Sequence, residues 1–226
     1  MSKRHNSFYF IHKALRVAMY EMATQLQHVD FSDVAATSET VQQLETLITL
    51  FDSHAHGEDH FYNEPLEARE PGIGKLFEQE HEEDHRLSQV LLQLVTDWRN
   101  ATTSEKRIEL GNLLFYSFNE FVAFNLYHMN KEELQLNEAL WRNFSDEEII
   151  GIEQTLVSQI PPDKMMKYAH WLMRGLSLQD LISWLTPIQQ HAPAPVFDAL
   201  LAIGREQIPA EKFKKLTAEL LVKEVI

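Results

Sequence analysis

Three pairs of ionisable side chains recur along this 226-residue chain at a spacing of four positions. The pairs are His54 and Glu58, His81 and His85, and His128 and Glu132. At about 3.6 residues per turn, two side chains four positions apart project from the same face of an α-helix, one turn apart. Each pair could therefore bind one metal ion or contact two. His12, near the N-terminus, is a seventh candidate.

All seven side chains fall on the apolar stripes of the helices that the sequence predicts. Burying that many ionisable groups is costly unless something compensates them, and a metal centre is the natural compensation. Imidazole and carboxylate without thiolate suit iron, manganese or zinc. Seven protein ligands are too many for one ion. They suit two six-coordinate ions with bridging carboxylates and one open position for a small molecule.

Other residues near these pairs stay open as candidates. His56 and His60 form a rival pair at the same spacing, but they lie off the apolar stripe that favours His54 and Glu58. His60 could still lie beside the ligands or replace one of them. Asn125 lies on the same stripe as His128, one turn earlier, where it could hydrogen-bond a ligand or a neighbouring helix.

Four long helices must position these residues, and the chain favours helix throughout. It has only 7 Gly and 8 Pro, and it lacks the alternating apolar runs that are typical of strands. Apolar stripes predict helices over about 7–28, 38–62, 73–98 and 104–139. Counted at about 1.5 Å per residue, the candidates on the first three helices lie about 20–25 Å from the same bundle end. We expect an all-α, up-down-up-down four-helix bundle over residues 1–140.

A second region follows the predicted bundle. Capping signals and scattered prolines predict several short helices from about residue 145 onward, which form a C-terminal all-helical subdomain over 141–226. We detect no internal repeat in the sequence.

Composition excludes several classes of function. Cysteine is absent, so disulfides, thiolate metal sites and cysteine nucleophiles are ruled out. The net charge of -14, without a basic patch, argues against nucleic-acid binding. Neither a signal peptide nor an apolar run of membrane-spanning length is present, so we expect a cytoplasmic protein without a membrane partner.

The full set of motifs resembles hemerythrin and the hemerythrin-like (HHE) cation-binding domains. The resemblance covers about residues 7–140 and rests on four strings: FIHKALR at 10–16, HAHGED at 54–59, EHEEDH at 80–85 and HMNKEE at 128–133. It implies a non-haem di-iron centre, in which manganese or zinc could substitute. The implied terminal ligands are His12, His54, His81, His85 and His128.

The same resemblance implies bridging carboxylates between the two irons. Glu58 would be one bridge. The family spaces its last carboxylate five positions after the histidine, which selects Glu133, whereas a residue five positions on points about 140° away on a helix, so geometry favours Glu132. Both glutamates stay candidates.

The function implied by this resemblance is non-enzymatic binding of dioxygen or a related small molecule, for carriage, storage or sensing. One alternative is a di-iron redox enzyme acting on peroxide or nitric oxide. Another is a metal-stabilised interaction module in which residues 145–226 contact a partner. An iron donor is a further possibility, but the version with N-terminal cysteines does not fit this chain. The sequence leaves the oligomeric state open.

Overall fold

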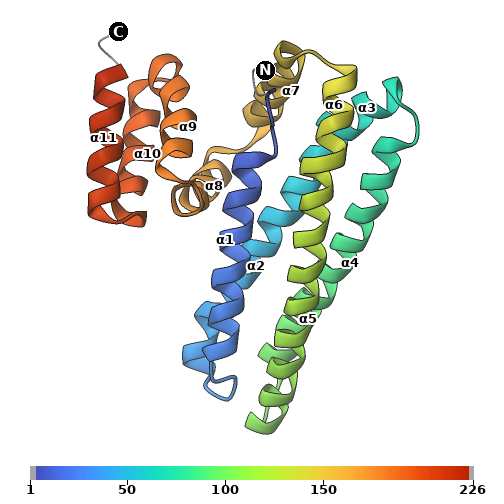
Figure 1. Ribbon diagram of the computed structural model, residues 1–226. Coiled ribbons are helices and arrows are strands. Elements are labelled where there is room, and N and C mark those ends of the chain that lie inside the picture. Colours follow the sequence, from blue (N-terminus) through green and yellow to red (C-terminus); the bar gives the residue numbers. More distant parts are fainter. Residues whose placement is uncertain (1–3, 224–226) are drawn as a thin grey trace. The chain divides into compact units, whose positions relative to one another are not determined.

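The computed structural model describes residues 4–223, and within that range every regular element is helical (Figure 1). The all-α prediction is therefore confirmed. None of the described helices combines the length and the apolar character needed to cross a membrane. In chain order the elements are α1 (Tyr9–His28), α2 (Val34–Glu58), η1 (Asp59–Asn63), α3 (Glu64–Arg69), α4 (Ile73–Asn100), α5 (Ser104–Lys131), η2 (Glu132–Leu136), α6 (Asn137–Asn143), α7 (Asp146–Gln159), α8 (Pro162–Gly175), α9 (Leu178–His191), α10 (Ala194–Gln207) and α11 (Ala210–Lys223).

Residue contacts divide the described chain into two compact units. The first contains residues 4–8 and 18–159, and the second contains residues 9–17 and 160–223. The division near residue 160 differs from the boundary expected at 140. The reason is an apolar cluster in the first unit, in which Leu140, Phe144 and Ile149 pack with Tyr62 and Phe77. This cluster keeps α6 and α7 with the long helices.

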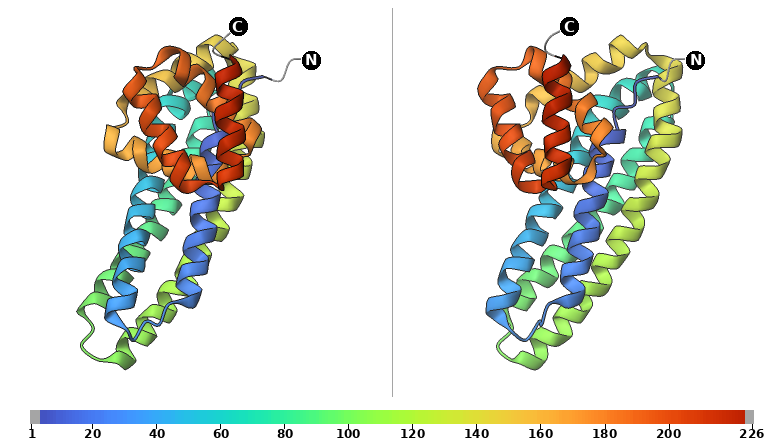
Figure 2. Two further views of the ribbon diagram at one scale, coloured as in Figure 1. Left: turned by 90° about the vertical axis from the view of Figure 1, so that its left-hand side faces the viewer. Right: turned by 60° about the vertical axis from the view of Figure 1, so that its left-hand side comes forward.

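Three long helices of the first unit, α2, α4 and α5, run side by side (Figure 2). Their starts follow local chemistry. The side chain of Asp33 accepts hydrogen bonds from the backbone at the start of α2, and Thr103 does the same for α5. Gly72 precedes α4 with φ of 102°, a left-handed conformation that favours glycine.

The second and fourth predicted helices are each interrupted by one π-helical segment. η1 follows α2 directly, and the amide of Glu64 donates to the carbonyl of Asp59, five positions back. η2 follows α5, with the same bond from Asn137 to Glu132. Each segment adds residues to a turn and so shifts the face that the following residues present. Such π segments often occur at functional sites.

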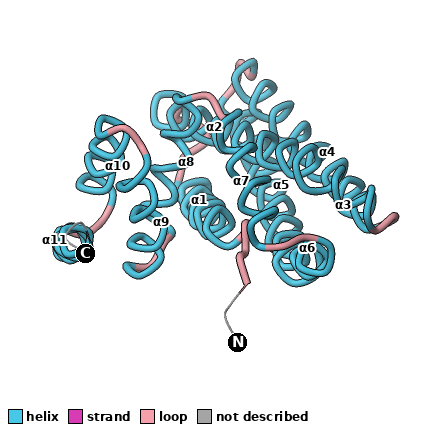
Figure 3. The backbone as a smooth tube through the Cα atoms, turned by 90° about the horizontal axis from the view of Figure 1, so that it is seen from above, coloured by secondary structure: helices cyan, strands magenta, loops and turns pink. Residues whose placement is uncertain are grey.

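The five helices from α7 to α11 repeat with a fixed period. Each has 14 residues, and each begins 16 residues after the one before it. The expectation of no internal repeat was therefore wrong. Within the second unit, α8 packs against α10 and α9 against α11. This pairing is typical of stacked helical repeats, and Figure 3 shows the short loops between the helices.

Candidate metal centre

A buried group of two glutamates and two histidines lies inside the first unit. It contains Glu58, His81, His128 and Glu132, and one ligand atom from each lies within 4.8 Å of the others. Nε2 of His81 is 3.5 Å from Oε2 of Glu58 and 3.4 Å from Oε1 of Glu132. Nε2 of His128 is 3.0 Å from the same Oε1 of Glu132. Both carboxylates therefore face the imidazoles closely enough to share an ion with them.

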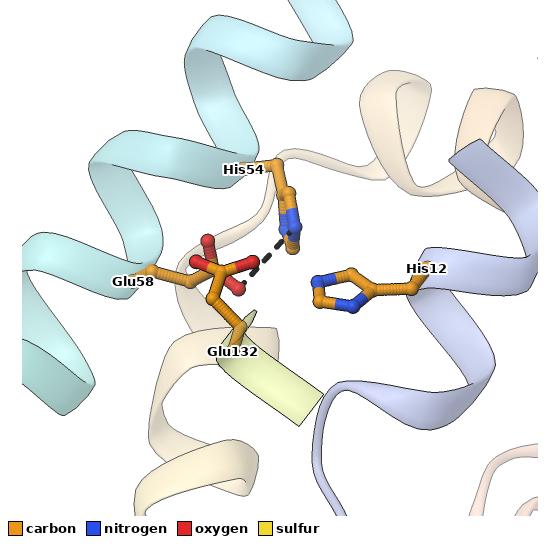
Figure 4. Close-up of side chains that lie close together, drawn as sticks. All are labelled: His12, His54, Glu58 and Glu132. Carbon is orange, nitrogen blue, oxygen red and sulfur yellow. Dashed lines mark ion pairs between the residues drawn. The ribbon is translucent and has the colours of Figure 1, made fainter. Parts of the chain in front are cut away.

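The same two glutamates belong to a second group. Here they meet His12 and His54, again with all four ligand atoms within 4.8 Å (Figure 4). Nε2 of His54 lies 3.3 Å from Oε1 of Glu58. The side chains of Glu58 and Glu132 are only 2% and 0% exposed. The same two buried carboxylates therefore belong to both groups of candidate ligands.

The two glutamates occupy special positions in the backbone. Glu58 is the last residue of α2, next to η1, and Glu132 is the first residue of η2. Both π segments therefore begin at or beside a shared carboxylate. His81 comes from the first part of α4 and His128 from the last turn of α5.

Two further carboxylates contact the other ring nitrogen, Nδ1, of the two histidines in the first group. Nδ1 of His81 donates to Oδ1 of Asp59 at 2.7 Å, and Nδ1 of His128 donates to Oε2 of Glu80 at 2.8 Å. Asn63 supports Asp59 with a hydrogen bond of 2.9 Å. A carboxylate on one ring nitrogen fixes the tautomer and directs the other nitrogen toward a metal.

These contacts also set the charge states of the group. Burial alone would lower the pKa of His81, but Asp59, Glu132 and Glu58 outweigh burial and raise this pKa to about 12. Burial is likewise outweighed at His128, mainly by the charge of Glu132, and its pKa is raised. In the metal-free protein, the neighbouring carboxylates therefore favour the protonated form of both imidazoles. A bound cation would release these protons.

The residues present fit a metal ion by their chemistry. Nε2 of His81 and Nε2 of His128 are buried and make no hydrogen bond to a described residue, although each faces a carboxylate. Nitrogen and oxygen ligands without sulfur suit iron, manganese or zinc. The group could therefore hold a cation, and its donor set does not distinguish among these metals.

Two of the predicted ligands lie outside both groups. The side chain of His85 is 63% exposed, and its Nδ1 lies 3.6 Å from Oδ1 of Asp52. Glu133 is half-buried and belongs to neither group, in agreement with the helix-geometry argument for Glu132. His56 and His60 are exposed, and His60 pairs with Glu64 at 3.3 Å.

An acid takes the inward position that the sequence pattern assigned to His85. Asp84 is 3% exposed, and its Oδ1 accepts a hydrogen bond of 2.5 Å from Nδ2 of Asn125. Burial raises the pKa of Asp84 to about 6, against the opposing effect of the Asn125 bond. Asn125 thus contacts a neighbouring helix, which is one of the two roles considered for it.

A small pocket opens beside the first group. It has room for roughly one water-sized molecule. Its lining combines ligand candidates with apolar and polar neighbours: Phe51, His54, Ala55, Glu58, His81, Asp84, Asn125, His128 and Met129. The ring of Phe124 stacks on His128 with centroids 5.8 Å apart, so this imidazole is covered on one face.

Three functional candidates escaped the sequence analysis: Asp59, Glu80 and Asp84. Asp59 and Glu80 directly follow or precede predicted ligands, at Glu58 and His81, and this adjacency was the one available signal. Nothing else in the sequence distinguished these three acidic residues from the many acidic residues expected at the surface. Comparisons with protein-family models, curated proteins and solved structures give no significant match to this chain.

Proposed function

We propose that this protein is a hemerythrin-like non-haem di-iron protein that binds dioxygen or a related small molecule. The observation that supports this proposal most directly is the sharing of two buried glutamates by two pairs of histidines. His12 and His54 would hold one ion, and His81 and His128 the other. Glu58 and Glu132 would contribute ligand atoms to both ions.

The proposal includes a four-helix bundle as the scaffold. Its members would be α1, α2, α4 and α5, arranged up-down-up-down, each of which contributes at least one ligand or carries one at its end. This arrangement would bring all six side chains to one level of the bundle. The carboxylates behind His81 and His128 support the same proposal, because metal-binding histidines usually donate their other nitrogen to such a group.

The pocket would be the place where the small molecule binds. It adjoins His54, Glu58, His81 and His128, so an occupant would contact residues of both groups. When bound, the iron pair would supply the electrons and the open coordination position. The protein would supply a fixed set of ligands, a covered imidazole at His128 and a pocket of limited size.

The test is the absorption spectrum of anaerobically iron(II)-loaded protein, recorded before and after air is admitted, with the iron-to-chain ratio measured on the same sample. We expect two irons per chain and new charge-transfer bands in air. Bands that disappear when oxygen is removed support carriage or sensing. Absence of bound iron would overturn the proposal.

One observation favours a second candidate, a di-iron redox enzyme acting on peroxide or nitric oxide. The pocket wall includes the carboxylate of Asp84, whereas a site devoted to reversible oxygen binding benefits from a dry, apolar wall. An irreversible ferric product in the same experiment, with consumption of added peroxide or nitric oxide, would support this candidate over carriage.

A further inference from the structure

Asp84 is a buried charged group in the pocket wall that neither metal group uses. It lies on α4 three positions after His81, so both side chains project from nearly the same helix face. It belongs to neither group of ligand atoms, yet it lines the pocket together with His81 and His128. A molecule in this pocket would therefore lie between the candidate ligands and Asp84.

The orientation of Asp84 is fixed by a neighbouring helix. Nδ2 of Asn125 donates both to Oδ1 of Asp84 and to the carbonyl of Phe121, at 2.5 and 3.1 Å. The amide is buried and held by its own helix, so it holds the carboxylate in place as well. A buried carboxylate that cannot turn away is costly when the molecule beside it does not compensate it by a hydrogen bond or a positive charge. The occupant of the pocket must therefore match Asp84.

The charge of Asp84 decides which occupants are compatible. With cations bound at the two groups, their positive charge would favour the ionised form of Asp84 over the neutral form that burial favours. An ionised carboxylate accepts hydrogen bonds and donates none. A neutral molecule with an O–H group can donate to it, whereas an anion is repelled. Dioxygen and nitric oxide have no proton to donate.

From this arrangement we propose that Asp84, positioned by Asn125, selects the ligand of the pocket: a neutral, hydrogen-bond-donating molecule of the size of water or hydrogen peroxide, in preference to a small anion. This inference rests on the metal pair of the proposed function, because the selection acts on whatever completes the coordination of that pair. Among the ligands considered there, it favours peroxide over dioxygen. It assigns Asp84 a role in ligand specificity, and it leaves metal binding to the six residues of the two groups.

The experiment uses the whole 226-residue chain, loaded with iron(III) and titrated with azide, a small anion that donates no hydrogen bond. Charge-transfer absorption reports azide binding, and hydrogen peroxide is then added as a competitor. We compare wild type with Asp84→Asn and Asp84→Leu. Both substitutions remove the negative charge, so azide affinity should rise about tenfold or more. Hydrogen peroxide should displace azide less effectively from Asp84→Leu than from wild type.

Glu83→Gln is the matched control, because it makes the same change of carboxylate to amide one position away. Glu83 faces Arg86 on the surface of α4, so azide affinity should not change. Iron content is measured first for every protein. Absence of iron in wild type would refute the proposed function itself.

Two outcomes would overturn the inference while leaving the proposed function intact. One is an azide affinity that stays unchanged or falls in both Asp84 variants at full iron content. The other is loss of iron from Asp84→Asn, which would make Asp84 a metal ligand. The near-isosteric Asp84→Asn variant decides the question if Asp84→Leu does not fold.

Discussion

Nδ1 of His81 donates a hydrogen bond of 2.7 Å to Oδ1 of Asp59, while Nε2 of the same ring faces Glu58 and Glu132. Asp59 is the first residue of η1 and directly follows Glu58. One short segment therefore supplies both a candidate ligand and the group that orients another. The π-helical turn begins at Asp59. We infer that it helps to position the carboxylates of Glu58 and Asp59 so that both contact the imidazole of His81.

Removal of this contact should weaken metal binding without unfolding the protein. In Asp59→Asn we expect the affinity for iron(II) to fall by about 10–100-fold, because an orienting carboxylate contributes about that much. Competition with a chelator measures it. In the metal-free protein, the same substitution should lower the pKa of His81, which NMR titration reports. Glu64→Gln, an exposed acid near η1, is the control, and an equal loss of affinity there would contradict the prediction.

The choice between Glu132 and Glu133 can be tested directly. Glu132 is fully buried and shared by both groups, whereas Glu133 lies outside them. Glu132→Gln should reduce the bound metal from two ions per chain to one or none, and Glu133→Gln should leave it unchanged. Metal analysis after gel filtration gives the ratio. The reverse result would favour the five-residue spacing of the hemerythrin pattern.

A parallel comparison concerns His85. The exposed imidazole lies outside the groups, so His85→Asn should keep the metal content of wild type. His81→Asn should lose the ion held with His128, because it removes a buried ligand candidate. Loss of an ion from His85→Asn would mean that α4 rotates on metal binding and presents the residue that the motif predicts.

Helical periodicity was sufficient to predict most of the candidate site. His12, His54, Glu58, His81, His128 and Glu132 all lie in the two groups, because each lies on an apolar stripe and stripes face the interior. Periodicity could not choose between Asp84 and His85. Positions three and four after His81 lie about 60° and 40° to either side of it. The packing of neighbouring helices, which the sequence does not state, decides which one turns inward.

Two other features of the fold were not predicted from the sequence. The π segments at η1 and η2 depend on one extra residue per turn, which composition does not reveal. The 16-residue period of α7 to α11 has one regular signal in the sequence, a serine or proline directly before each helix: Ser145, Pro161, Ser177, Pro193 and Pro209. These residues were interpreted only as helix boundaries. Equal helix lengths in the structure make this repeat evident.

The contact between His5 and Glu153 should make stability depend on pH. Nε2 of His5 lies 2.6 Å from Oε2 of Glu153, and this hydrogen bond raises the pKa of His5 above 6.5 despite partial burial. When the pKa of a group is higher in the folded than in the unfolded protein, the resulting stabilisation is complete at pH values below the unfolded-state pKa. It is lost as the pH rises through the folded-state pKa. Glu153→Gln should therefore lower the free energy of unfolding at pH 6 and have little effect at pH 9.

Urea unfolding at the two pH values measures this difference, and NMR titration of His5 measures its pKa. Glu147→Gln changes an exposed acid in the first turn of the same helix, α7, and serves as the control. A pH-independent effect of Glu153→Gln would show that the ion pair does not form in solution.

Two glycines offer a matched test of packing in the first unit. A Cβ at Gly111 of α5 would lie 2.0 Å from Cγ of Phe31, whose ring is buried and whose carbonyl accepts a hydrogen bond of 3.1 Å from Nε1 of Trp98. Since the ring is buried and the hydrogen bond holds the backbone of Phe31, the added methyl group has little room, and Gly111→Ala should destabilise the protein by about 1–3 kcal/mol. A Cβ at Gly151 of α7 would meet no atom within 4 Å.

Gly151→Ala should therefore stabilise the protein by about 0.5–1 kcal/mol, because alanine restricts the unfolded chain more than glycine does and favours helix. Chemical denaturation of the metal-free protein measures both changes against wild type. If Gly111→Ala lowers the free energy of unfolding and Gly151→Ala raises it, packing against Phe31, and not helix propensity, controls the result at Gly111. Equal stabilisation by both variants would mean that Phe31 does not pack on α5, and that the loop between α1 and α2 lies elsewhere in solution.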